Sequence, residues 1–176
     1  GLAAQDAATQ RITQRALAKE RAASDINRLV NVSVRRTTAI VKSSDPSLGT
    51  YFAEDTKATT GEARELAERI TALLESAEEK DIWDKYQAAI DAFIVARDAA
   101  VAARIEGRAE EAERLLAQSY EPAARRMTAV VQALLDLERA AIDADARSAH
   151  EESASARFST IVTGALAVAL GALIAW

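Results

Sequence analysis

Apolar residues recur along most of the chain at intervals of three and four positions, separated by polar residues. That spacing places them on one face of a helix, which is typical of helices packed in a bundle. Three such faces are expected to line a common core. They are Phe52, Thr56, Thr59, Ala63, Leu66, Ile70 and Leu73; Tyr86, Ile90, Phe93, Arg97 and Val101, with Trp83 beside them; and Leu116, Tyr120, Ala123, Met127, Val130, Leu134, Leu137 and Ala141.

Polar residues, proline and glycine interrupt this pattern at three places. Pro46 ends the first helix, because proline disfavours the helical conformation of the residue before it. Residues 75–81 are polar, and Gly107 stands where a helix C-cap favours glycine. The sequence therefore predicts an all-α, antiparallel up-down four-helix bundle with two long and two shorter helices. The predicted helices are residues 2–42, 48–74, 82–105 and 109 onwards, with a kink or a fresh start at Pro122.

The last stretch of the chain, residues 158–176, carries no charged residue and is mostly apolar. An apolar run of about 18 residues or more can cross the hydrocarbon core of a bilayer. No proline separates this run from the amphipathic stretch before it, so we expect the fourth helix to continue into a membrane. The chain then divides into a helical domain, residues 1–157, and the start of a transmembrane helix, residues 158–176. The first predicted helix is nearly as long as the fourth helix up to residue 157, so it should also begin near the membrane. This predicts another membrane helix before Gly1.

Composition excludes several classes of protein. The net charge of −5 argues against a nucleic-acid partner, because such proteins normally carry a basic face. The chain has no cysteine and a single histidine, His150, and it lacks a glycine-rich phosphate loop and a serine elbow. We therefore expect neither an enzyme nor a metal site, and no cofactor.

Polar residues replace apolar ones at one level of the predicted bundle, about nine residues below the turns at Pro46 and Gly107. A buried guanidinium requires an anion, and arginine binds carboxylates with two parallel hydrogen bonds. Threonine and tyrosine hydroxyls add neutral donors. This level therefore predicts a pocket for a small carboxylate between the helices. Its expected members are Asn31, Arg35, Thr38, Thr56, Thr59, Arg97 and Tyr120.

A simpler interpretation of the same residues remains open. Arg35 and Arg97 can extend to solvent, or pair with Asp55 or Asp98. Arg28 lies two helical turns before Arg35 and faces either the same pocket or a second subunit.

Several short motifs, taken in order, resemble the four-helix-bundle sensor domains of bacterial methyl-accepting chemotaxis proteins. They are DINRLVNVSVRR at 25–36, KSSDP at 42–46, Ala96-Arg97, residues 102–107, EEA at 110–112 and YEP at 120–122. The resemblance covers nearly the whole chain. It implies a homodimer formed through the first helix, with residues 1–157 in the periplasm and the anchor in the bacterial inner membrane. It also implies a downstream chemotaxis adaptor and kinase, reached through a cytoplasmic part.

The same resemblance implies a ligand. First-helix arginines of the family commonly bind carboxylates, which points to Arg28 or Arg35. Thr56, Thr59, Arg97 and Tyr120 match members that sense tricarboxylic-cycle acids, so a di- or tricarboxylate is favoured. Because Trp83 and Phe93 are nearby, an aromatic acid remains an alternative. An amino acid is a further alternative. The competing interpretations are the sensor domain of a histidine kinase and a membrane-anchored coiled coil without a ligand.

Overall fold

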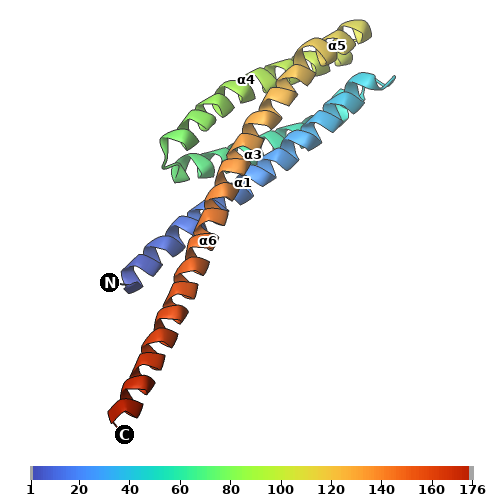
Figure 1. Cartoon of the computed structure of the whole chain (residues 1–176). Helices are drawn as coiled ribbons and strands as arrows, with labels where there is room; N and C mark the ends of the chain where they lie inside the picture. Colours follow the sequence, from blue (N-terminus) through green and yellow to red (C-terminus); the bar gives the residue numbers. More distant parts are fainter. Residues whose placement is uncertain (1, 175–176) are drawn as a thin grey trace.

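The structure is a computed structural model that describes the backbone of residues 2–174 and the side chains of residues 10, 11, 13–144 and 146–148. The described backbone forms helices and no strand, which confirms the all-α prediction (Figure 1). The elements, in chain order, are α1 (Leu2–Lys42), α2 (Leu48–Tyr51), α3 (Ala53–Leu73), α4 (Ala77–Ile105), α5 (Ala109–Leu115), the π-helical turn η1 (Leu116–Tyr120) and α6 (Glu121–Ile174).

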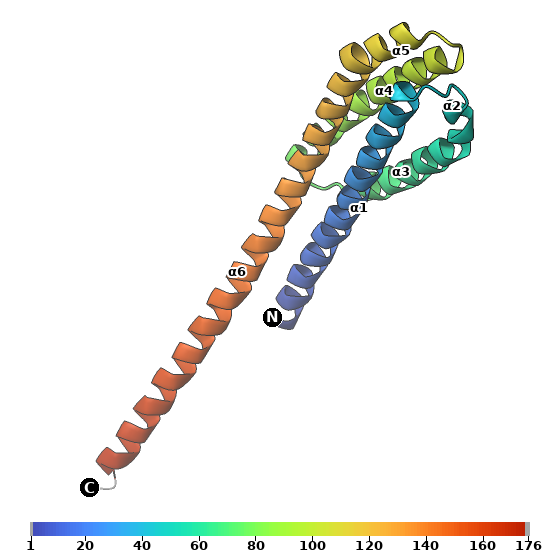
Figure 2. The ribbon, with the colours of Figure 1, turned by 90° about the vertical axis from the view of Figure 1, so that its right-hand side faces the viewer.

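The helices alternate in direction between two ends of the molecule. The α1–α2 turn and the α4–α5 turn meet at one end, here called the tip, and both termini lie toward the other (Figures 1 and 2). With 41 and 54 residues, α1 and α6 are much longer than α3 and α4, with 21 and 29. The prediction of two long and two shorter helices is therefore confirmed.

Polar contacts hold the tip together. The guanidinium of Arg104 donates to the backbone carbonyl of Ser43, and Lys42 Nζ lies 3.5 Å from Glu113 Oε2. Gly107 ends the α4 side of the tip with a φ of 77°, a left-handed conformation that glycine adopts without steric strain. The two turns that the sequence placed at one level are thus neighbours.

The start of α4 differs from the prediction. Residues 75–81 were expected to be a polar gap, whereas α4 begins at Ala77. Ser76 Oγ accepts from the Glu79 backbone N–H at 3.0 Å, and Glu79 Oε2 accepts from the Ser76 N–H at 2.9 Å. This reciprocal capping box starts the helix, and its polar residues form the first turn.

The break predicted at Pro122 takes the form of the π-helical turn η1. Proline lacks an N–H, and its ring collides with the carbonyl four residues earlier. A wider helical turn before it relieves this collision, and such turns often occur at functional sites. The turn leads directly into α6 and places Tyr120 in the core, where it is fully buried.

Among the described residues, no helix is long and apolar enough to cross a membrane. The predicted transmembrane segment, residues 158–176, lies outside the residues whose side chains are described. Its place in a membrane therefore stays a prediction.

Candidate ligand-binding site

The bundle is partly open between α3 and α4. The helix α3 packs on α1, and α4 packs on α6, whereas α3 and α4 make little contact with each other. A cavity of about 180 Å³ lies in this opening. Apolar side chains form most of its wall, namely Ile26, Leu29, Val30, Ala63, Ala67, Ile90, Phe93, Ile94 and Met127. The polar residues around it are Ser33, Thr59, Thr60, Arg64, Tyr86, Gln87, Asp91 and Arg97.

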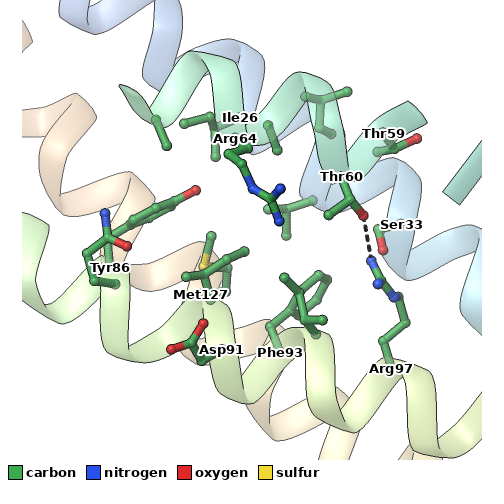
Figure 3. A pocket seen from close by; sticks show the side chains of 17 residues that line it. Ile26, Ser33, Thr59, Thr60, Arg64, Tyr86, Asp91, Phe93, Arg97 and Met127 are labelled. Carbon is green, nitrogen blue, oxygen red and sulfur yellow. Dashed lines mark hydrogen bonds between the residues drawn. The ribbon is translucent and has the colours of Figure 1, made fainter. Parts of the chain in front are cut away.

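Arg97 is the buried cation of this cavity. Its residue is only 8% exposed, and its Nη1 donates to Thr60 Oγ1 at 3.0 Å (Figure 3). Its Nε donates to Asp98 Oδ1 at 2.8 Å, but the Asp98 side chain is 61% exposed. A solvated carboxylate compensates a buried guanidinium weakly, because water screens the pair. Arg97 therefore offers a charge that a second carboxylate, entering the cavity, can satisfy.

Arg64 supplies a second guanidinium from α3. Figure 3 shows it reaching into the space between α3 and α4, on the side opposite Phe93. Arg64 and Arg97 also border an open groove on the outer face of α3 and α4, together with Thr56 and Lys57. Two arginines thus stand where the cavity meets the groove.

A third arginine, Arg36, lies close to these groups, where the sequence prediction had placed Arg35. Arg36 Nη1 donates to Thr59 Oγ1 at 3.1 Å and to Thr56 Oγ1 at 3.4 Å. Arg35 itself is exposed. The helix α1 buries Ile26, Leu29, Ser33, Thr37 and Ile40, and this spacing places Arg36 toward α3.

The register predicted for the first helix was therefore wrong. Asn31 is exposed and its Nδ2 donates to the Asn27 carbonyl of its own helix at 2.9 Å, while Thr38 is half-buried. Neither lines the cavity, and nor does Arg35. Arg28 is exposed as well and pairs with Glu62 on α3 at 3.1 Å. Ligand contacts of these α1 residues stay predictions, since a second subunit would be needed to cover them.

The predicted aromatic residues divide into two layers. Phe93 lines the cavity, and the ring of Tyr120 stands behind it with 5.1 Å between ring centroids. Burial raises the pKa of Tyr120, whose hydroxyl lies 3.4 Å from Ser33 Oγ. Trp83 stacks on Tyr86 at 4.2 Å and donates from Nε1 to Thr71 Oγ1 at 2.8 Å. Tyr86 is the cavity member of that pair, and burial raises its pKa to about 12.

The structure thus brings Thr59, Phe93 and Arg97 to the cavity and Thr56 to the adjoining groove. It places Tyr120 and Trp83 one layer behind. Sequence reasoning missed Thr60, Arg64 and Tyr86. The apolar spacing of α3 runs through Ala63 and Leu66, so Thr60 and Arg64 looked like solvent-facing neighbours of that face.

The chain matches the model of a protein family described as a four helix bundle sensory module for signal transduction, over residues 2–155. Because the match spans most of the sequence, the chain belongs to this family of sensory modules. The resemblance to chemotaxis-receptor sensor domains is thereby confirmed. Modules of this family are normally the periplasmic part of a membrane receptor. No curated protein matches the sequence.

Proposed function

We propose that the chain is the sensor domain of a transmembrane chemoreceptor and that it binds a small organic acid in the cavity between α3 and α4. The observation that carries this proposal is Arg97, a buried guanidinium beside a largely apolar cavity, whose carboxylate partner Asp98 is solvated. A ligand carboxylate can accept two parallel, charge-assisted hydrogen bonds from the Arg97 guanidinium, the bidentate geometry for which arginine is suited.

The size and polarity of the cavity favour an acid whose carboxylate is attached to a single apolar group. A cavity of about 150 Å³ lined by leucine, isoleucine and phenylalanine binds benzene. The present cavity is about 180 Å³, and Ile26, Leu29 and Phe93 form part of its apolar wall. It therefore suits a single aromatic ring or branched chain, with its carboxylate directed toward Arg97 and Thr60.

A di- or tricarboxylate is the second candidate, and the outer groove supports it. Arg36, Arg64 and Lys57 supply further positive charge near Thr56 and Thr59. Several carboxylates would leave the apolar walls unused, and each would lose its hydration on entering the cavity. Such an acid therefore suits the groove better than the cavity. An amino acid is a third candidate, because Asp91 borders the cavity that Arg97 also lines.

Binding between α3 and α4 would act on the packing of α1 and α6. A ligand shifts a conformational balance only by its different affinity for the two states, and helix shifts of about 1–2 Å are typical of such switches. The helix α6 runs unbroken from Glu121 to Ile174 and would carry such a shift away from the tip. The proposal includes a homodimer through α1, whose face with Arg28, Val32 and Arg35 is exposed. It also includes the inner-membrane anchor and the downstream adaptor and kinase.

Calorimetric titration with single-ring acids, branched-chain acids, tricarboxylates and amino acids tests the proposal. We expect the single-ring or branched acids to bind the wild-type chain and to lose most of their affinity in Arg97→Met. Arg69→Met is the matched control, because Arg69 is an exposed arginine of α3 that does not line the cavity. If no acid binds, or if both variants lose affinity equally, the proposal is wrong. If only tricarboxylates bind, the second candidate replaces the first.

A further inference from the structure

Three ionisable side chains meet inside the other end of the bundle, around the turn between α3 and α4, here called the base. Lys19 comes from α1, Glu79 from the first turn of α4 and Glu138 from α6. They are 3%, 7% and 1% exposed. Lys19 Nζ contacts Glu79 Oε1 and lies 3.2 Å from Glu138 Oε1. The cluster therefore joins three helices, two of which are the long ones.

The two carboxylates of this cluster are not equivalent. Glu79 accepts from the backbone N–H groups of Glu75 and Ser76 at 2.6 and 2.9 Å, as part of the α4 capping box. Among the described residues, Glu138 accepts from no backbone N–H group, and the lysine that it faces is the one that Glu79 also contacts. One lysine thus faces two buried carboxylates, which leaves one excess negative charge away from water.

A buried excess charge is expensive unless another group neutralises it. The neighbouring cations are already paired at the surface: Arg15 of α1 with Glu75 at 3.0 Å, and Arg139 of α6 with Glu20 at 3.0 Å. Within the described part of the chain, no third acidic or histidine group joins the cluster to form a metal site. A proton is the remaining neutralising species.

The pKa values of the two carboxyl groups agree with the binding of a proton by the cluster. Burial raises the pKa of Glu138, the charge of Lys19 offsets part of that rise, and the nearby Glu79 adds to it, so that the pKa reaches about 7. Burial also raises the pKa of Glu79, but hydrogen bonds from Lys19 and from the backbone outweigh burial and bring that pKa to about 2. A proton taken up by the pair therefore resides on Glu138, which then donates it to Glu79 in a hydrogen bond.

We propose that Lys19, Glu79 and Glu138 form a proton-binding site that couples the packing of α1, α4 and α6 at the base to external pH. With the proton bound, the cluster is neutral overall and holds the three helices together. When the proton leaves, Glu138 becomes negatively charged and shares Lys19 with Glu79. A shift of α6 that brings Glu138 into water then becomes favourable. The module then responds to protons at a site separate from the acid-binding cavity.

Carbon-13 NMR of the glutamate carboxyl groups, recorded on the full chain in nanodiscs, tests proton binding directly. We expect one carboxyl signal to titrate close to pH 7 and to disappear in Glu138→Gln. Glu20→Gln is the matched control, because Glu20 also joins α1 to α6 but does so at the surface. A titration of Glu138 in the range of an ordinary glutamate would overturn the proposal.

Spin labels test the movement, and the absence of native cysteine makes the labelling specific. Labels at Gln14 and Arg147, both exposed, report the α1–α6 distance below the cluster, while labels at Ala39 and Gln118 report the tip. Labelled chains are diluted in an excess of unlabelled chains so that distances within one chain dominate. We expect the base distance to change between about one pH unit below and one above the Glu138 midpoint, and the tip distance to stay constant.

The variants decide what the change means. In Glu138→Gln the base distance should be the same at both pH values, while in Glu20→Gln and in His150→Gln, which removes the one histidine, it should change as in the wild type. A base distance that is constant in the wild-type chain, or a change that persists in Glu138→Gln, contradicts the proposal. Neither result bears on whether an acid binds near Arg97, because that test uses a different site and readout.

Discussion

Among the residues whose side chains are described, the tip half and the base half of the bundle each bury one cation, Arg97 and Lys19, and the charges around these two cations are opposite in balance. Arg97 has a neutral hydroxyl partner, Thr60, a solvated carboxylate partner, Asp98, and a cavity of about 180 Å³ beside it. Lys19 has two buried carboxylates, and the cleft one helical turn away from the cluster, lined by Ala23, Trp83 and Leu134, has no room for a water molecule. A cation with too little negative charge and free space suits an organic anion. A cation with too much negative charge and no space suits a proton.

Removing Lys19 should have the largest effect. Lys19→Met leaves Glu79 and Glu138 buried without their cation, and breaking a buried ionic group in this way costs about 3 to 5 kcal/mol. Urea unfolding at neutral pH measures this loss. The control Arg15→Met removes an exposed partner of Glu75 and should change the free energy of unfolding by less than about 1 kcal/mol. Equal losses in the two variants would mean that the base cluster is no different from a surface pair.

Glu138→Gln should change the pH dependence of stability. The folded state holds the Glu138 proton more tightly than the unfolded state, because the pKa rises from the ordinary 4.5 to about 7. Its contribution is complete below pH 4.5 and is lost as the pH rises to about 7, by about 3 kcal/mol for these 2.5 pKa units.

The contribution of Glu79 changes only below pH 4.5, because its pKa is lowered, so the two carboxyls do not overlap. The free energy of unfolding of the wild type should therefore fall between pH 4.5 and 7. In Glu138→Gln it should fall by about 3 kcal/mol less over the same range. Parallel curves for the two proteins would show that Glu138 titrates normally.

Filling the cavity should stabilise the tip half and prevent binding. Ala63→Leu adds methylene groups to a half-buried position on the cavity wall, and each buried methylene contributes about 0.8 kcal/mol. We expect a gain of about 1 kcal/mol in thermal unfolding and no heat of binding in calorimetry. Ala72→Leu, at an exposed position of the same helix, should do neither. Undiminished binding by Ala63→Leu would place the ligand elsewhere.

The smallest expected effect concerns Asp98. This carboxylate competes with a ligand for Arg97, although its exposure makes the pair weak. Asp98→Asn should therefore strengthen acid binding by about 0.5 kcal/mol, roughly twofold. Calorimetry of both proteins with the same acid measures the change, and a loss of affinity would mean that Asp98 helps to position Arg97 for the ligand.

The sequence predicted the helices more reliably than the site. Apolar spacing located the core faces of α3, α4 and α6, because residues such as Ile70, Phe93 and Leu134 bury large areas and dominate the pattern. On α1 the buried positions include Ser33 and Thr37, whose polarity hid the true face and shifted the expected arginine from Arg36 to Arg35.

The base cluster was beyond sequence reasoning for a related physical reason. Lys19, Glu79 and Glu138 look like ordinary surface residues of charged helices, and only their meeting across three helices makes them buried. The capping box at Ser76 was visible as a Ser-x-x-Glu spacing and would have placed the start of α4 correctly. The opening between α3 and α4 depends on how the helices are tilted, which local spacing does not encode.

Met127 gives the most direct test of the acid-binding cavity. It is the only methionine of the chain, is fully buried and lines the cavity, so a carbon-13 label on its methyl group gives one signal from the site. Titration with a single-ring carboxylic acid should move that signal in the wild-type chain and leave it nearly unchanged in Arg97→Leu, which removes the guanidinium without adding a second methionine. A signal that stays still for every acid, or moves equally in both proteins, would contradict the proposal that this cavity binds an organic acid through Arg97.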